Sequence, residues 1–280
     1  MVRRILITGV NGFIGKSLTR YFMGYKDEFS VAGIDLQKEP VIKDIEYYPF
    51  DVTLSELPST LHFDYVIHLA GQPSVWNAEQ NPRNDFTTNV TGSINIILSA
   101  LKLNAPVIFL STIALYESRD GAQSETDAPV PRNWYGMDKM IVEQYLEFVH
   151  RKYNLPYVVF RAAYLYDKSI ERGPIADLKT KGNLYKFNCS RSVFDFIHTE
   201  DLFSAILKVI KKQFVLSSIF NMGSGTGTPL SALGEILNEV IPPEDDTKQS
   251  KQLVLDPAKF KQFYEWEPAH NILHEIREIV

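Results

Sequence analysis

A glycine-rich turn near the start of the chain constrains the fold more than any other feature. The turn, Thr8-Gly9-Val10-Asn11-Gly12-Phe13-Ile14-Gly15, separates an apolar run of strand length at residues 2–7 from helical apolar spacing at residues 13–22. Glycines here allow a sharp bend and bring backbone amides close to a pyrophosphate at the helix N-terminus. A turn that binds no ligand can have the same spacing, so a second signal is needed.

Asp35 supplies that second signal. It follows another apolar run, residues 30–34, and lies 20 residues after Gly15. A carboxylate at this place accepts hydrogen bonds from the adenosine ribose of a dinucleotide. It also repels a 2′-phosphate, and Leu36 and Gln37 follow it rather than an arginine. These residues predict a bound dinucleotide and favour NAD over NADP.

Strand-like and helix-like segments alternate along most of the chain. Apolar runs recur at residues 65–69, 107–110, 157–161 and 219–221, and helical spacing at about 84–103, 134–153 and 229–240. This alternation predicts an α/β fold with a doubly wound parallel sheet. Residues 1–165 and about 194–235 are expected to form the dinucleotide-binding domain. Residues of about 166–193 and 236–280, polar and turn-rich in part, are expected to form a small C-terminal substrate lobe.

Composition excludes several classes of protein. Of the 280 residues, 45% are hydrophobic and 22% charged, and the net charge is -5, which favours neither nucleic acid nor an anionic membrane. Cys189 is the only cysteine, so it cannot form an internal disulfide or a metal site alone. The first apolar run ends at Thr8-Gly9, too early for a signal peptide, and no run spans a membrane. We expect a cytoplasmic protein with no metal.

A Tyr-x-x-x-Lys motif, Tyr135 to Lys139, opens the pattern at residues 134–153. On a helix the two side chains share a face, and an ammonium beside a phenol favours phenolate. The phenol can then exchange a proton with a substrate hydroxyl while hydride moves to nicotinamide, and the lysine can hold the nicotinamide ribose.

Position separates this motif from a second match at Tyr164 and Lys168. The first motif follows a strand that ends at Thr112, and ligands of open parallel sheets bind at strand carboxyl ends. The Thr112 hydroxyl could contact the reacting oxygen. The plainer alternative is a surface tyrosine and lysine beside a buried threonine.

The ordered motifs resemble the NAD-dependent epimerase/dehydratase family, the extended short-chain dehydrogenases/reductases with a Rossmann fold. The resemblance covers nearly the whole chain. It rests on residues 8–15, Asp35, Asp51-Val52, 68–71, 89–92, 111–116, 135–139, Arg161, 194–198, Asp201, 221–225, Asp256 and 266–268.

The resemblance implies roles for individual residues. Thr112, Tyr135 and Lys139 would be catalytic. Asp51 and Val52 would contact adenine, residues 69–71 the pyrophosphate and nicotinamide ribose, and Asn89 the nicotinamide end. The implied cofactor-binding set is Gly9, Gly12, Phe13, Ile14, Gly15, Asp35, Leu36, Asp51, Val52, Leu69, Ala70, Gly71, Asn89, Tyr135 and Lys139. Three further matches are expected to be structural: His68 as a packed strand residue, Asp201 as a cap or polar anchor, and Trp266 in packing.

Some positions depart from the family pattern. Asp138 stands in place of the usual serine, Glu117 of glycine, Tyr164 of asparagine and Phe194 of arginine, and the segment 167–194 is short. The last three departures lie in the expected substrate lobe or directly beside it, so the sugar and nucleotide stay open. The substrate-binding candidates are Gln72, Ser74, Tyr164 and Arg191.

The residues after Thr112 bear on the reaction. Dehydratases of this family have Asp-Glu there, whereas Ile113 and Ala114 cannot transfer a proton. A nucleotide-sugar 4-epimerase with tightly held NAD is the leading hypothesis, favoured by Asp35 and by residues 71–75. A 4-ketosugar reductase that exchanges NAD(P)H is the alternative, favoured by the short lobe. A catalytically inactive Rossmann binding or sensor protein is disfavoured because the three catalytic residues are present.

The helical patterns at residues 84–103 and 134–153 are apolar over more than one stripe. One sheet face cannot cover that much surface, which indicates a partner. Members of the family often pair these helices, so we expect a homodimer.

Overall fold

The computed structural model describes the chain except residues 1, 171–172, 174, 177–191, 215–216 and 238–250. Arg191 and Cys189 therefore lie outside the described residues, as does the end of the helix expected at 229–240. The described part of that helix is α8 (Leu230–Leu237).

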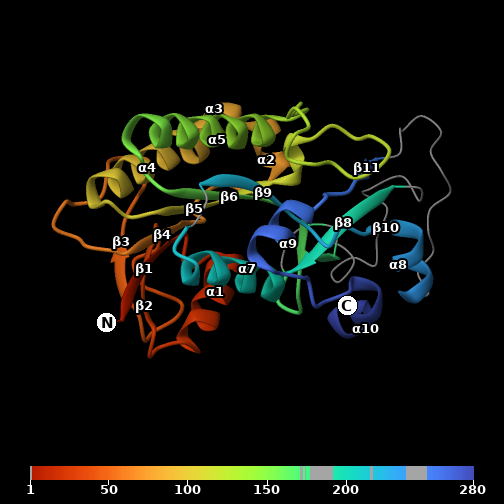
Figure 1. Ribbon diagram of the computed structural model, residues 1–280, viewed down its shortest axis with the longest axis horizontal. Helices are drawn as coiled ribbons and strands as arrows, with labels where there is room; N and C mark the ends of the chain where they lie inside the picture. Colours follow the sequence, from red (N-terminus) through yellow and green to blue (C-terminus); the bar gives the residue numbers. More distant parts are fainter. Residues whose placement is uncertain (1, 171–172, 174, 177–191, 215–216, 238–250) are drawn as a thin grey trace. The chain divides into compact units, whose positions relative to one another are not determined.

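A seven-stranded sheet is the main element of the fold (Figure 1). Its strand order is β3-β2-β1-β4-β5-β6-β9, and neighbouring strands from β3 to β5 are parallel. The predicted parallel sheet is confirmed. The strands are β1 (Arg3–Thr8), β2 (Phe29–Asp35), β3 (Glu46–Pro49), β4 (Tyr65–His68), β5 (Val107–Thr112), β6 (Tyr157–Ala162) and β9 (Ser218–Met222).

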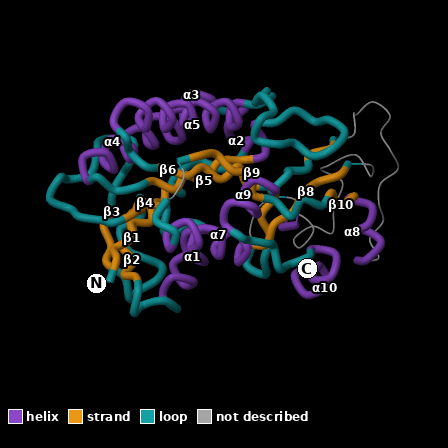
Figure 2. The backbone as a smooth tube through the Cα atoms, viewed as in Figure 1, coloured by secondary structure: helices purple, strands orange, loops and turns teal. Residues whose placement is uncertain are grey.

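Helices cover both faces of this sheet (Figure 2). On one face lie α3 (Pro82–Phe86), α4 (Gly92–Leu103) and α5 (Trp134–Tyr153), and α1 (Phe13–Met23) lies on the other. The sheet is buried on both faces, and β4 and β6 are buried at every position, as their continuous apolar sequence requires. Asn133 caps α5 through its Oδ1, which accepts from the Gly136 amide at 2.7 Å.

The helix expected at residues 84–103 contains a π-helical turn, Thr87–Thr91, between α3 and α4. The spacing of apolar residues does not reveal a π-helical turn, because such a turn alters that spacing over a single turn of the helix. Such turns occur frequently at functional sites, and this one places Asn89.

The chain divides into two compact units. The first comprises residues 1–115, 131–160 and 206–219, and the second residues 116–130, 161–205 and 220–280. The second unit is larger than the lobe expected from sequence, and it includes the strand β8 (Val193–His198). The physical reason is that β8 pairs with β7 (Tyr164–Tyr166), β10 (Gly227–Pro229) and β11 (Gln252–Leu253) in a separate sheet.

Buried polar groups connect the elements of the second unit. The Asp195 carboxylate accepts from the amides of Ser224, Gly225 and Leu255 at 2.9, 3.3 and 3.1 Å. Asp201, in α7 (Thr199–Lys211), accepts from the amides of residues 269 and 270, so the predicted anchor role is confirmed. The unit also contains α9 (Ala258–Tyr264) and α10 (Ile272–Ile279).

Trp266 is buried against Phe260, as the packing prediction requires. Among the helices that the structure describes, none combines the length and the apolar character needed to cross a bilayer.

Candidate functional site

The glycine turn joins β1 to α1 through close backbone contacts. Gly9 has φ +68°, and a Cβ atom at Gly15 would lie 2.2 Å from the Gly9 carbonyl oxygen. Only glycine therefore fits at either position without a shift of the turn. Gly12 caps α1 without a side-chain hydrogen bond, and the first turn of α1 has no acidic residue. The positive end of the helix dipole thus meets no acidic side chain from its own first turn and is suited to a phosphate.

Asp35 lies at the end of β2, beside this turn. Its Oδ2 accepts from the Asn11 amide at 3.0 Å. The Asn11 side chain in turn holds the segment after β2: its Nδ2 donates to the Glu39 carbonyl at 3.0 Å, and its Oδ1 accepts from the Val41 amide at 2.8 Å. The carboxylate expected at the ribose is therefore oriented by the turn expected at the pyrophosphate.

Thr8 connects β1 to the end of β4. Its Oγ1 accepts from the amides of Leu69 and Ala70 at 3.1 and 3.0 Å and lies 2.7 Å from His68 Nδ1. His68 Nε2 lies 2.9 Å from Ser93 Oγ, and burial lowers the pKa of His68 to about 3. His68 is thus a neutral packed residue, as expected, and not an acid–base group.

Gly71, Asn89 and Lys139 come together at the carboxyl edge of the sheet. A Cβ atom at Gly71 would lie 2.7 Å from Asn89 Oδ1 and 4.0 Å from Lys139 Nζ. Asn89 is held by Gln72, whose amide donates to its Oδ1 at 2.8 Å and whose carbonyl accepts from its Nδ2 at 3.0 Å. Residues far apart in sequence, which the resemblance assigned to the cofactor, therefore share one location.

Other residues assigned to the cofactor lie along the same unit. Asp51 Oδ1 accepts from the amide and the hydroxyl of Thr53. Val52 is buried against Gly92, where an added Cβ atom would lie 2.8 Å from Val52 Cγ2. Leu36 is 70% exposed after β2. Phe13 and Ile14 begin α1 and are partly buried.

Tyr135 lies in the first turn of α5 and is half-buried beside Thr112 at the end of β5. Hydrogen bonding by Thr112 acts to lower the pKa of the phenol. Gly136 allows this approach, since a Cβ atom there would lie 2.5 Å from the Ala114 carbonyl oxygen. The glycine inside the motif is a signal that sequence reasoning did not use.

Lys139 is buried one turn further along α5. Its Nζ donates to the Leu110 carbonyl at 3.0 Å and lies 4.5 Å from the centroid of the Phe109 ring. Burial lowers the pKa of Lys139 to about 8, while the charges of Asp85, Glu143 and Asp138 oppose that shift. The cation is therefore desolvated and held among carboxylates.

The phenol does not behave as the motif alone predicts. We expected the ammonium to lower the pKa of Tyr135, but burial raises that pKa, and the charge of Asp85 adds to the increase. The Thr112 hydroxyl opposes it only in part. Lys139 Nζ lies 5.8 Å from the Tyr135 ring centroid, so direct stabilisation of a phenolate is weak.

Two of the substrate candidates make internal contacts. Gln72 Nε2 donates to the Ser74 carbonyl at 3.0 Å and to Asp85 Oδ1 at 2.6 Å. Ser74 caps α2 (Val75–Gln80), where its hydroxyl accepts from the Asn77 amide.

Tyr164 lies in β7 of the second unit, with its ring centroid 4.9 Å from that of Phe194 and 5.9 Å from that of Phe196. Two departures from the family pattern, Tyr164 and Phe194, are therefore in contact. Lys168, of the second Tyr-x-x-x-Lys match, pairs with Glu278 on the surface. Because Tyr164 lies in a strand, Lys168 is not brought beside it as the fourth residue along a helix would be.

Among the described residues one group of possible metal ligands occurs, His198, Glu200 and His270. The two imidazole rings stack with centroids 3.9 Å apart and planes 17° from parallel. Nitrogen lone pairs lie in the ring plane, so rings stacked in this way do not aim at one ion. His270 Nδ1 also already contacts Glu275 Oε1 at 2.7 Å. We assign no metal to this group.

Sequence reasoning missed three acidic or polar neighbours of the motif. Ser111 Oγ donates to Glu143 Oε1 at 2.5 Å, and both are buried. Asp85 is 1% exposed and contributes to the electrostatics of both Tyr135 and Lys139. Glu143 lies four residues after Lys139, which helical spacing could have indicated; Asp85, on another helix, had no such signal.

Comparison with known proteins agrees with this geometry. A model of the NAD dependent epimerase/dehydratase family matches residues 5–223. The UDP-glucose 4-epimerase of Halalkalibacterium halodurans is 26% identical over 312 aligned positions, which cover 98% of this chain and 93% of that protein. The GDP-6-deoxy-D-talose 4-dehydrogenase of Aggregatibacter actinomycetemcomitans is 29% identical, with 91% and 89% covered.

Solved structures give the same fold. The crystal structure of UDP-glucose 4-epimerase with UDP-glucose from Thermotoga maritima superposes with a TM-score of 0.83 and 26% identity, covering 99% of this chain and 97% of that one. The UDP-glucose 4-epimerase of Thermus thermophilus in complex with NAD has a TM-score of 0.81 and 24% identity, and it supports the fold alone.

Gly15→Ala should weaken NAD binding by at least about tenfold, because the methyl group must push the turn away from α1. Titration calorimetry with NAD measures the effect. Gly24→Ala is the matched control: its φ is -66°, and its added Cβ would lie 3.2 Å from one carbonyl oxygen. Equal affinities for the two variants would show that NAD does not use this turn.

Proposed function

Because the chain belongs to the NAD dependent epimerase/dehydratase family, we propose that it is a nucleotide-sugar epimerase acting at C4 of the sugar. The observation that carries the proposal is the grouping of Thr112, Tyr135 and Lys139 beside Gly71 and Asn89 at the sheet's carboxyl edge. Ligands of open parallel sheets bind at this edge.

The residues present fit an NAD cofactor. The glycine turn and the first turn of α1, which has no acidic residue, would bind the pyrophosphate, and Asp35, held by the Asn11 amide beside that turn, would accept from the ribose. Lys139 would bind the nicotinamide ribose, with Asn89 beside it. When bound, NAD accepts a hydride from the substrate carbon and returns it.

Tyr135 is the proposed acid–base residue. Its phenolate takes the proton of the sugar C4 hydroxyl as that carbon is oxidised, and it returns the proton after the 4-keto sugar has turned its other face. Thr112, at the end of β5 next to the phenol, would donate its one hydroxyl proton to the same reacting oxygen when substrate is bound. Since burial raises the pKa of Tyr135, the phenol needs added positive charge to ionise near neutral pH. The positively charged nicotinamide ring of NAD would supply most of that charge, because Lys139 Nζ is 5.8 Å from the centre of the Tyr135 ring and contributes only weakly.

One alternative has an observation in its favour. The relative with 29% identity is named as a GDP-6-deoxy-D-talose 4-dehydrogenase, which fits a 4-ketosugar reductase that exchanges its cofactor. Dehydration has no support, because Ile113 is buried and Ala114 has no group that moves a proton. A binding or sensor protein without catalysis would not require Tyr135 to lie beside Thr112.

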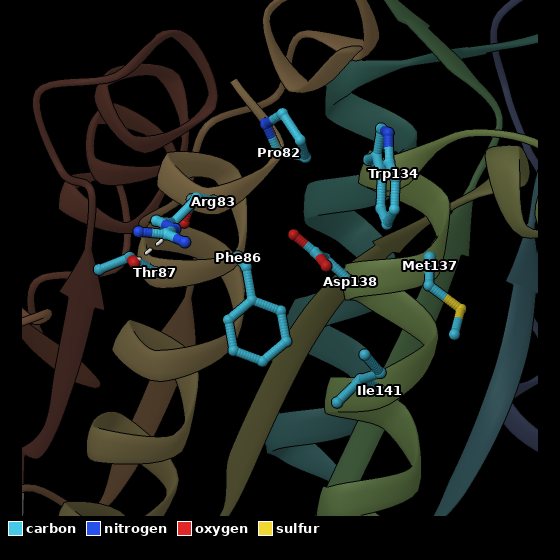
Figure 3. A pocket seen from close by; sticks show the side chains of 8 residues that line it. All are labelled: Pro82, Arg83, Phe86, Thr87, Trp134, Met137, Asp138 and Ile141. Atoms are coloured by element: carbon cyan, nitrogen blue, oxygen red, sulfur yellow. Dashed lines mark hydrogen bonds between the residues drawn. The ribbon is translucent and has the colours of Figure 1, made fainter. Parts of the chain in front are cut away.

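We also propose a homodimer through α3, α4 and α5. Large apolar side chains are exposed along α3 and α5: Phe86 is 45%, Trp134 50%, Met137 40% and Phe148 49% exposed. Figure 3 shows the groove between α3 and α5 to which Phe86, Trp134 and Met137 contribute. A second copy presenting the same helices would cover these side chains, as an isologous contact requires.

Tyr135→Phe should lower turnover by about a hundredfold or more while NAD remains bound, since only the transferable proton is lost. Interconversion of UDP-glucose and UDP-galactose is the first assay, with other nucleotide sugars to follow. Tyr153→Phe, an exposed tyrosine at the end of the same helix, should leave turnover unchanged. Turnover that survives Tyr135→Phe would contradict the assigned role.

Phe148→Glu should convert the dimer to a monomer, because a charge would be buried at the proposed contact. Light scattering over a range of protein concentration gives the mass. Phe263→Glu is the control, since Phe263 is 45% exposed on α9, which belongs to the second unit and not to the proposed contact. A wild-type mass that stays monomeric at every concentration would refute the dimer.

A further inference from the structure

Two aspartates on different helices meet beside the catalytic motif. Asp85 lies on α3 and is 1% exposed, and Asp138 lies on α5 and is 2% exposed. Figure 3 shows the Asp138 carboxyl group directed from α5 toward α3. Asp138 directly precedes Lys139, at the position where the family pattern has serine.

The hydrogen bonds around these carboxyl groups are incomplete. Asp85 Oδ1 accepts from Gln72 Nε2 at 2.6 Å. Among the described residues, no donor reaches Oδ2 of Asp85 or Oδ2 of Asp138. Each side chain thus keeps one buried oxygen without a donor, on helices that contact one another, and a hydrogen bond to Asp85 is among the causes that raise the pKa of Asp138. A carboxylate cannot donate, so this contact requires a proton on one of the two groups.

We propose that Asp85 and Asp138 form a proton-sharing carboxyl pair, which places one negative charge beside Lys139 and Tyr135 and sets the pH range in which they act. The pair is a positioning device for charge and does not touch the substrate. Its effect on turnover rests on the proposed function, but the shared proton itself does not.

Charged groups face this cluster from several elements. Lys139 meets Asp85 from α3, Asp138 and Glu143 from α5, and His68 from β4, which stays neutral. Two further charges lie nearby. Arg83 lines the groove on α3, and Glu79 of α2 accepts from the Trp134 amide. Lys139 is the one buried cation described next to the pair, so loss of the shared proton acts on it directly.

The pair should respond to pH near neutrality. Burial raises the pKa of Asp138 to about 7, and Asp85 adds to the increase, while Lys139 opposes it. Above that pH the pair gains a second negative charge. The added charge favours the ammonium of Lys139 and disfavours the phenolate of Tyr135, so the pKa values of both side chains rise.

The first test needs no substrate. In the folded protein Asp138 keeps its proton up to about pH 7, whereas the unfolded chain loses it near 3.8. The folded state therefore binds more protons between these values, and the stability that Asp138 contributes falls as pH rises through this window. In thermal unfolding, the Tm of the wild type should therefore fall relative to the Tm of Asp138→Asn as the pH rises through this window. The infrared band of a buried protonated carboxyl group should be present in the wild type and lost in Asp138→Asn.

Asp85→Asn should change the Tm difference and remove the infrared band in the same way, because it also leaves a single carboxyl group with no partner to share a proton. Glu147→Gln, an exposed acid on α5, is the control and should change neither readout. A Tm difference independent of pH, together with no protonated carboxyl band in the wild type, would overturn the proposal.

The second test uses the pH profile of kcat/KM. Asp138→Asn and Asp138→Ser remove the charge that the wild type gains above pH 7, so both limbs of the profile should move to lower pH by about one unit. A variant that lowers kcat/KM equally at all pH values would show a packing role and contradict the proposed effect on pH.

The two tests separate two kinds of failure. A protonated carboxyl band without turnover on any nucleotide sugar would reject the epimerase and leave the pair intact. Turnover with an unshifted profile would reject the pair's effect and leave the epimerase intact.

Discussion

The buried ammonium group of Lys139 is the constraint around which the site is organised. A cation with so little access to water needs acceptors and counter-charges, and the structure supplies the Leu110 carbonyl, the Phe109 ring and the carboxyl groups of Asp85, Asp138 and Glu143. These groups come from β5, α3 and α5, so the helices and the sheet must pack closely for the lysine to be stable. Gly136 permits that packing, because any side chain there would meet the Ala114 carbonyl.

In the proposed function, the same constraint brings the cofactor and the reacting hydroxyl to one place. Lys139 Nζ lies near Gly71 and Asn89, which the Gln72 backbone holds, while Tyr135 lies one helical turn away next to Thr112. The phenol is costly to ionise in this setting. The ionisation of the phenol therefore depends on the charges around it. Asp138 is similar in size to the serine of the family pattern, but it brings a titratable carboxyl group to the site.

Much of the architecture could be predicted because each signal is local. The glycine turn, the Asp35 spacing and the apolar runs depend on neighbours in sequence. The six strands that the apolar runs predict and the helix at 134–153 appear where they were expected, whereas β3 and the strands of the second sheet were not predicted. The pairing of Asp85 with Asp138 could not be predicted, since it depends on the packing of two helices separated by more than 40 residues of sequence. The π-turn at Asn89, the separate sheet around β8 and the aromatic contact of Tyr164 with Phe194 likewise depend on tertiary contacts.

The central claim is that NAD is held by this chain and recycled within the site. Denaturing the freshly purified protein and identifying any nucleotide released tests it most directly. The epimerase account predicts NAD in amounts stoichiometric with the chain. A protein that releases no nucleotide, and that binds and exchanges NADH or NADPH reversibly, would contradict that account and favour the 4-ketosugar reductase.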